Sequence, residues 1–401
     1  MMAMSSDGSD ATAQELIPLL LPDVPSLQDI FPWLERVHAA RHFSNFGPLV
    51  SELERIFATQ FAVESKQVST VANATLGLEL VLQSLDLPPK SRILVPSFTF
   101  VATVTAVLRA GHIPVLADVD DSNWMLTPEI ARFAHAYMPV AAILPVATFG
   151  MPQDMQAWQQ FEVETNVPVV IDAAAGYGSQ WLDGAHGTLV FSLHTTKSLP
   201  AVEGGIVVSS RPGLAAKVRE LSNFGINLNS AAGLPVGMLA STGTNAKMSE
   251  YHAAVCLAAL QDWEHKAAMR RSLQAELIRK LDFVSEGTLR WQAISSGGGL
   301  QAPMLLCPRL PSEECRQRLE KICSQQNISF RRWYQPLLAD MPVLNGRCHV
   351  LDIPVARALS RELLGLPFFL GMQDAQKDRL FQAISSSLKR KERLKEFRYL
   401  T

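Results

Sequence analysis

Between residues 91 and 222 the chain alternates short apolar segments with segments of helical periodicity. The apolar segments have the length of buried strands and lie at 91–96, 112–119, 140–146, 167–172, 188–193 and 205–209. Helical patterns lie at 99–109, from about residue 127, at 154–164 and at 214–222. Because parallel neighbouring strands need a crossover, usually a helix, this order predicts an α/β fold whose mainly parallel sheet carries helices on both faces.

The alternation stops near residue 253, where one long helical pattern, or two in series, runs to residue 281. Shorter strands and helices follow it. We therefore expect a tail and a leading helix at 1–40, a large α/β domain at 41–265 and a smaller α+β domain at 266–401. A chain of 401 residues is long enough for two or three domains.

Charge and cysteine content exclude several classes of protein. Charged residues make up 18% and the formal net charge is −2, which argues against nucleic acid or an anionic membrane as a partner. The five cysteines include no CxxC pair, which indicates reduced thiols of a cytoplasmic protein rather than a disulfide framework or a zinc site. The apolar segment 16–21 is short and contains Pro18, so we expect neither a signal peptide nor a membrane span there.

Two ionisable residues stand at predicted strand ends, which is where open α/β sheets bind ligands. Asp172 ends the strand at 167–172, and a buried carboxylate needs a partner, such as a protonated ring nitrogen. A helix cap or a structural ion pair is the alternative. Lys197 follows the strand at 188–193, where burial would lower the pKa of its amine and favour Schiff-base formation. Taken alone, Lys197 is more typical of a surface lysine.

Three further polar residues surround Lys197 in the sequence. Ser192 and His194 fall on the same side of the strand end, and Ser192 can donate to a phosphate. His194 is either a ligand contact or a packed structural residue. Glu203 opens the turn Glu-Gly-Gly, in which glycines allow the backbone to approach a ligand closely.

A helix start and an aromatic residue complete the pattern. Asn73 precedes Ala74, Thr75 and an apolar helical segment, so it would cap that helix and leave first-turn amides for an anion. An ordinary capped helix is the alternative. Phe100 follows the strand at 91–96, where it can stack on a flat ring or pack in the core.

The order of these features resembles the DegT/DnrJ/EryC1/StrS family of sugar aminotransferases, within the aspartate aminotransferase superfamily (PLP fold type I). The resemblance covers about residues 43–395. It is carried by the segments SNFGPLVSELERIFA, NATLGLEL, LVPSFTFVATVTAVLRAGHIPVLADVD, PVATFGMPQDM, VIDAAAGYG, VFSLHTTKSLPAVEGG, LSNFGI, GTNAKMSEYHAA and LGLPFF.

The resemblance implies roles for individual residues and pyridoxal 5′-phosphate (PLP) as the cofactor. Lys197 matches the family's Schiff-base lysine, and Asp172 matches the partner of the pyridine nitrogen. The phosphate contacts correspond to Ala74, Thr75 and Ser192, the stacking aromatic to Phe100, and Asn245 to an asparagine that reaches the phosphate of the neighbouring subunit. The family therefore implies a homodimer with shared active sites.

The chain departs from the family pattern at several positions. Ala175 replaces a common glutamine, Val202 a glycine, Lys247 an arginine and Leu338 a histidine, and NGT reads NAT at residues 73–75. The combination HTTK, NFGI and NAKM resembles the branch that acts on nucleotide-linked 4-keto-6-deoxy sugars.

The resulting hypothesis is transamination from L-glutamate to a nucleotide-linked ketosugar. Candidate substrate contacts are His194, Glu203, Arg331, Trp333 and Tyr334, and Arg331 or Arg332 would bind the phosphates unless both are solvated. A sugar dehydratase of the same family would carry histidine at the position of Lys197. A non-catalytic regulator or scaffold with this fold is the other alternative, and the pair Lys197 and Asp172 argues against it. A Rossmann dehydrogenase lacks support because no GxGxxG follows the early strands.

Overall fold

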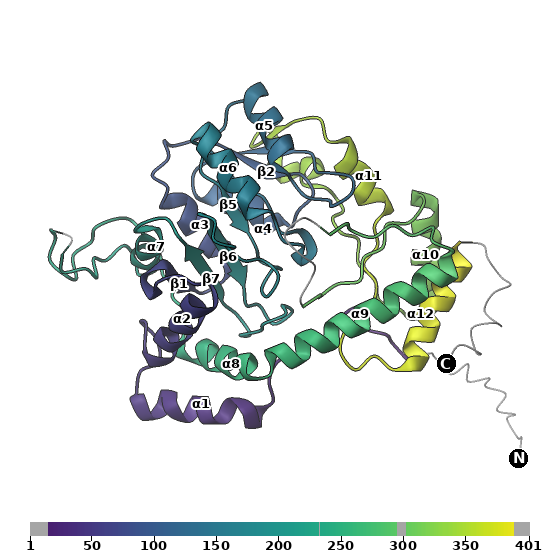
Figure 1. Ribbon diagram of the computed structural model, residues 1–401, viewed down its shortest axis with the longest axis horizontal. Helices are drawn as coiled ribbons and strands as arrows, with labels where there is room; N and C mark the ends of the chain where they lie inside the picture. The colour runs from purple at the N-terminus through teal and green to yellow at the C-terminus, as the bar shows by residue number, and fades with distance from the viewer. Residues whose placement is uncertain (1–14, 232, 295–301, 389–401) are drawn as a thin grey trace, which may run out of the picture.

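The computed structural model describes residues 15–231, 233–294 and 302–388 (Figure 1). Its strands form two ladders with the orders β1-β7-β6-β5 and β4-β2-β3-β8, and single parallel bridges join Ile143 to Val169 and Val146 to Asp172 between them. The pairs β5–β6, β2–β3, β2–β4 and β3–β8 are parallel, whereas β7 is antiparallel to β1 and β6. The strands are β1 (Val68–Val71), β2 (Arg92–Pro96), β3 (Ile113–Ala117), β4 (Ala142–Ile143), β5 (Val170–Asp172), β6 (Thr188–Ser192), β7 (Gly205–Ser209) and β8 (His349–Val350).

Helices cover both faces of this sheet, so the predicted α/β architecture is confirmed. The long pattern after residue 253 is two helices in series, α8 and α9, which meet at Asp262. The helices are α1 (Leu27–Ala40), α2 (Pro48–Gln60), α3 (Ala74–Gln83), α4 (Val101–Arg109), α5 (Pro128–Tyr137), α6 (Met155–Thr165), α7 (Leu214–Ser222), α8 (Glu250–Gln261), α9 (Trp263–Ser285), α10 (Glu313–Gln325), α11 (Pro354–Glu362) and α12 (Asp374–Ser387).

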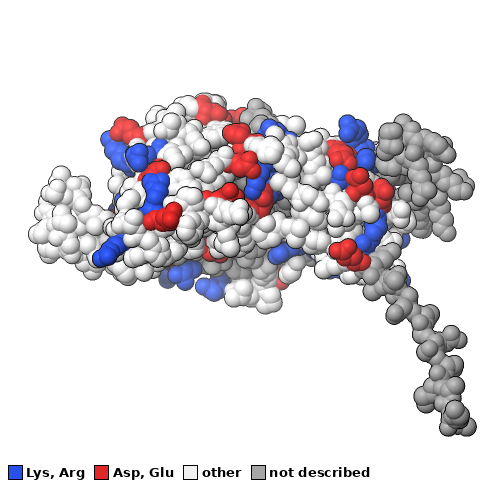
Figure 2. All heavy atoms as spheres, turned by 90° about the horizontal axis from the view of Figure 1, so that it is seen from below, with Lys and Arg blue, Asp and Glu red and all other residues white. Residues whose placement is uncertain are grey.

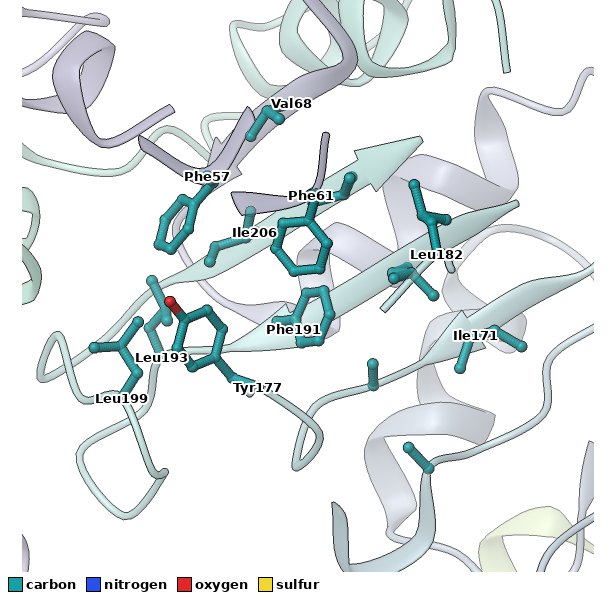
Figure 3. Close-up of a cluster of buried hydrophobic side chains, with 14 of the residues drawn as sticks. Phe57, Phe61, Val68, Ile171, Tyr177, Leu182, Phe191, Leu193, Leu199 and Ile206 are labelled. Carbon is teal, nitrogen blue, oxygen red and sulfur yellow. The ribbon is translucent and has the colours of Figure 1, made fainter. Parts of the chain in front are cut away.

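Side-chain alternation along the strands builds two core layers. On the face toward α2, Phe191 and Ile206 pack with Phe57 and Phe61 (Figure 3). On the other face, Val190 packs in a second cluster with residues of α3 and α7. Because a strand directs successive side chains to opposite faces, a sheet buried on both sides has nearly continuous apolar strands, as the sequence shows.

The chain beyond α9 forms a further cluster with its own buried side chains from α10 and α12. α9 carries the chain away from the sheet toward these helices (Figure 1). Ile17 joins the same cluster and pairs with Ile328, so the segment before α1 packs on the C-terminal part of the chain. The predicted domain limits at residues 40 and 265 stay a prediction.

The surface carries both signs of charge. Figure 2 shows Lys and Arg side chains interspersed with Asp and Glu on the face that it presents, with wide uncharged areas between them. Among the described residues, the longest apolar helical stretches fall short of what crossing a membrane requires.

Candidate active site

A cavity of about 700 Å³ lies at the carboxyl ends of β5 and β6, between the N-termini of α3 and α4. Its wall brings together almost all the predicted site residues from widely separated parts of the chain. They are Ala74, Thr75, Phe100, Asp172, Ser192, His194, Lys197, Glu203, Arg331, Trp333 and Tyr334. Asn245 is exposed and does not line this cavity.

Asp172 is the last residue of β5 and is 4% exposed. Its Oδ2 accepts a 2.7 Å hydrogen bond from the Thr103 hydroxyl, and its Oδ1 accepts one of 3.1 Å from the Ala174 amide. Burial raises the pKa of Asp172, and these two donors oppose that shift. In the part of the chain that the structure describes, no cationic side chain lies within ion-pair distance of this carboxylate. A cationic ligand in the cavity would supply the missing partner.

Thr103, which the sequence reasoning missed, is fully buried on α4 and donates directly to Asp172. We expect Thr103→Val to raise the pKa of Asp172 further, because the carboxylate loses its shorter hydrogen bond. If activity needs the charged carboxylate, the acid limb of the pH–activity profile moves to higher pH and activity near neutrality falls about tenfold. Thr105→Val, which removes an exposed hydroxyl from the same helix, is the matched control. Unchanged acid limbs in both variants would contradict this role.

Lys197 lies in a tight turn beyond β6, in which its amide donates to the carbonyl of His194 at 2.8 Å. Burial lowers the pKa of the Lys197 amine, and the charge of Asp172 opposes that shift. The structure therefore places a readily neutralised amine and a buried carboxylate in one cavity. A neutral amine is the form that attacks a carbonyl carbon.

The lowered pKa of Lys197 predicts how covalent loading with an aldehyde depends on pH. The amine must be neutral to react, so the loading rate of the apo protein should rise with pH and level off below the ordinary lysine pKa of 10.5. Stopped-flow mixing with the aldehyde over a pH series measures this rate. A rate that keeps rising to pH values near that of a free lysine would show that Lys197 has an ordinary amine.

The N-terminus of α3 faces the same cavity. Asn73 caps the helix by accepting from the Leu76 amide at 2.9 Å. The amides of the first helical turn have no acceptor within the helix, so those at Ala74 and Thr75 are suited to an anion. Ser192, 8% exposed on the neighbouring strand end, adds a hydroxyl to this wall.

Gly205 allows α3 to begin this close to the sheet. A Cβ at Gly205 would lie 2.8 Å from the Ala74 nitrogen, and backbone atoms there cannot rotate away. We expect Gly205→Ala to displace the helix start, to weaken cofactor affinity about tenfold and to lower the free energy of unfolding by about 1–3 kcal/mol. Titration of the apo protein and thermal unfolding measure both. Gly204→Ala is the control, because its Cβ would meet chiefly the flexible end of Met248. Equal cofactor affinities in the two variants would contradict the expectation.

His194 and Glu203 form a pair on the wall beside Lys197. The His194 Nδ1 lies 2.9 Å from the Thr196 hydroxyl, and its Nε2 lies 3.7 Å from Glu203 Oε1. Both side chains are close to half exposed. They can therefore reach a ligand in the cavity.

Aromatic side chains form the opposite wall. Phe149, which the sequence reasoning missed, stacks on Tyr334 at 5.8 Å between ring centres, and Trp333 packs against both. Burial raises the pKa of Tyr334, so its phenol stays protonated. Phe100 lies on the cavity wall with 49% exposure, and therefore not in the core.

The two adjacent arginines differ in placement. The guanidinium of Arg331 lies 4.5 Å from the centre of the Trp333 ring and lines the cavity. Arg332 does not line it, because both oxygens of Glu320 hold its guanidinium at 2.7 Å. The suggestion that either arginine binds phosphates therefore applies to Arg331 alone.

Four departures from the family pattern can be placed in the structure. Val202 has φ +66°, in the left-handed region that favours glycine and is strained for a β-branched residue, which explains why glycine is usual there. Leu338 is buried in the core and does not line the cavity, whereas Ala175 does. Lys247 donates to Asn245 at 2.7 Å, and both lie on the chain that leads out of a projecting segment.

The cavity fits a flat heterocycle that carries an aldehyde, a phosphate and a protonated nitrogen. Lys197 offers the amine for the aldehyde, and Asp172 feels the charge of Lys197 but has no cationic side chain within ion-pair distance among the described residues. The α3 amides, which the bare backbone of Gly205 allows to lie close to the sheet, offer donors for the phosphate. Pyridoxal phosphate has all three groups.

Comparison with known proteins agrees with this assignment. A model of the DegT/DnrJ/EryC1/StrS aminotransferase family matches residues 28–385. The dTDP-4-amino-4,6-dideoxy-D-glucose transaminase of Shigella dysenteriae is 29% identical over 361 residues, which make up 86% of this chain and 92% of that protein.

Solved structures of similar proteins share the whole fold. A protein of Bacillus cereus ATCC 10987 described as a PLP-dependent aminotransferase has a TM-score of 0.83 at 25% identity, covering 94% of this chain and 100% of that one. DesI, solved in the presence of its TDP-sugar product, has a TM-score of 0.82 at 26% identity, covering 96% and 97%. The expected fold type I is therefore confirmed.

Proposed function

The chain belongs to the DegT/DnrJ/EryC1/StrS aminotransferase family, and from this premise we propose that it moves an amino group from L-glutamate to a nucleotide-linked 4-keto-6-deoxy sugar. The observation that carries the proposal is the placement of Lys197 and Asp172 in one cavity. The sugar-nucleotide part is supported by the transaminase of Shigella dysenteriae, whose name specifies a dTDP-linked 4-amino-4,6-dideoxy sugar, and by DesI, which was solved with its TDP-sugar product.

Pyridoxal phosphate is the cofactor, as the sequence motifs predicted. When bound, it supplies an electron sink that stabilises negative charge on the carbon next to the amino group. The residues that would hold it are Lys197, Asp172, Phe100, Ser192 and the amides at 74–75.

Lys197 is proposed as the base and acid of the reaction. Its Nζ, once neutral, takes the proton from Cα of glutamate and later delivers a proton to the former keto carbon of the sugar. The lowered pKa of this amine supports both steps, because it favours the neutral form that accepts the proton, and the ammonium so formed can then donate one.

Asp172 is proposed to keep the cofactor's ring nitrogen protonated. Its burial makes the interaction with a nearby positive charge strong, and the Thr103 and Ala174 donors favour the charged carboxylate. Tyr334 and Phe149 reduce contact with water on the opposite wall.

The substrate contacts are proposed from the cavity wall. Arg331 has the charge for a sugar diphosphate, and its guanidinium lies over the Trp333 ring. His194 and Glu203 offer hydrogen-bonding groups near Lys197 for the hydroxyls or carbonyl of a sugar.

A homodimer with shared active sites is part of the proposal. Asn245 lies outside the cavity of its own chain, next to a segment that projects beyond α7 (Figure 1). This segment exposes apolar side chains to between 42 and 66%, namely Leu228, Leu234, Val236, Met238 and Leu239. Exposed apolar patches of this kind often mark interfaces, and docking on a second copy would bring Asn245 near its cofactor phosphate.

Transfer of a labelled amino group tests the function directly. The PLP-loaded enzyme is incubated with ¹⁵N-glutamate and a panel of nucleotide-linked 4-keto-6-deoxy sugars, and products are read by mass spectrometry. We expect one labelled aminosugar nucleotide and an equal amount of 2-oxoglutarate. An enzyme that consumes glutamate but aminates a different class of ketone would contradict the sugar substrate.

A further inference from the structure

Residues 331–333 run along the edge of the cavity with alternating side-chain directions. Arg331 and Trp333 line the cavity, whereas Arg332 between them does not. Side chains two positions apart fall on the same side of an extended chain, so the guanidinium of Arg331 can stack on the Trp333 indole. The position of Arg331 in the cavity thus depends on what fixes its neighbours.

Glu320 holds the side chain of Arg332 outside the cavity. Arg332 Nε donates to Oε1 and its NH2 nitrogen to Oε2, both at 2.7 Å, which is a bidentate pair. Glu320, on α10, is only 7% exposed and also accepts from Arg316, which in turn donates to the carbonyl of Arg361. A bidentate arginine–carboxylate pair fixes orientation as well as distance. Loss of the Glu320 charge would take from Arg332 the carboxylate that holds it and would leave Arg316 paired with Glu313 alone, at 3.3 Å.

Gly365 fixes the same segment from a second direction. Its carbonyl accepts from the Arg331 amide at 3.0 Å, and its amide donates to the Arg331 carbonyl at 2.7 Å. A Cβ at Gly365 would overlap Nε1 of Trp333 and lie 2.7 Å from its Cδ1, so the indole rests on the bare α-carbon. Any side chain at residue 365 would push Trp333 away, and with it the surface on which Arg331 stacks.

We propose that Glu320 and Gly365, neither of which lines the cavity, are positioning residues for the nucleotide-sugar substrate. They hold the Arg331–Trp333 stack where its guanidinium binds the substrate's diphosphate. This inference rests on the proposed function. It concerns the acceptor alone, because the groups that handle the amino donor at Lys197 and Asp172 lie on other elements.

Two independent variants test the positioning in the full-length PLP-loaded enzyme. Glu320→Gln keeps the side-chain shape but loses the charge, and Gly365→Ala adds one methyl group beneath Trp333. Glu314→Gln removes a charge from the exposed side of the same helix and is the matched control. The measurements are KM and kcat for the keto sugar nucleotide, the dissociation constant of dTDP, and the rate of the isolated reaction with glutamate.

We expect Glu320→Gln and Gly365→Ala to raise KM and the dTDP dissociation constant about tenfold, with kcat within about twofold of the wild type. The rate with glutamate and all values of Glu314→Gln should equal those of the wild type. Wild-type KM and dTDP affinity in both variants would overturn the proposal, as would a parallel loss of the glutamate reaction, which indicates general damage. A wild type that reacts with glutamate yet binds no sugar nucleotide would instead refute the proposed function, and this inference with it.

Discussion

Lys197→Ala should abolish transamination, with a loss of kcat of about 10³-fold or more, and should remove the visible absorption of cofactor bound covalently to the protein. The structure gives the reason. Lys197 offers its amine in a cavity where burial lowers the amine's pKa. Asp172 lines the same cavity from the end of the neighbouring strand. Both covalent attachment and proton transfer depend on that one nitrogen.

Two further variants distinguish the loss of covalent attachment and proton transfer from the general effect of replacing a lysine. Lys197→Arg keeps a positive charge near Asp172 but cannot attach the cofactor, so it should be as inactive as Lys197→Ala. Lys321→Ala, which removes an exposed lysine on α10, should behave as the wild type. Added methylamine replaces the missing amine and should restore part of the activity of Lys197→Ala. Activity of Lys197→Ala within tenfold of the wild type would exclude Lys197 as the catalytic lysine.

Asp172→Asn should lower kcat by about 10²-fold or more while the protein still binds its cofactor. Asparagine keeps the shape but carries no charge, and its single side-chain oxygen can accept a hydrogen bond from either Thr103 or Ala174. The cofactor's ring nitrogen would then lose the carboxylate that favours its protonated form. The measured quantity is the rate at which the α-proton of glutamate exchanges with deuterated solvent.

The matched control for this variant is Asp183→Asn, at an exposed position that does not line the cavity. It should leave proton exchange unchanged. An Asp172→Asn enzyme that exchanges the α-proton as fast as the control would show that the carboxylate is structural, which is the alternative that the sequence left open.

Several features could be predicted from the sequence because they depend on local order. Continuous apolar strands indicated a sheet covered on both faces, and strand-end polar residues indicated where a ligand binds. Asp172, Ser192 and Lys197 stand at such ends, and parallel packing brings their strands side by side. The helix cap at Asn73 could be predicted for the same reason, since capping is a local pattern.

Other features depend on contacts across the chain that no local pattern reveals. In the sequence, Thr103 looks like any other helix residue. Its role follows from the packing of α4 against β5, which brings the Thr103 hydroxyl to Asp172. The sequence does not distinguish Arg332 from Arg331. They differ in the structure because Glu320 of α10 accepts hydrogen bonds from the Arg332 guanidinium. Ile17 belongs to a short apolar segment in the sequence, and no local pattern shows that it pairs with Ile328 and is fully buried. In each case a partner more than ten residues distant decides the role.

The most direct test of the central claim is an absorption spectrum of the PLP-loaded protein, recorded before and after L-glutamate and again after a nucleotide-linked ketosugar. We predict a visible band that depends on Lys197, its shift to shorter wavelength with glutamate, and its return when the ketosugar takes the amino group. A protein that shows no such band even after PLP is added would contradict the account and favour a non-catalytic role for this cavity.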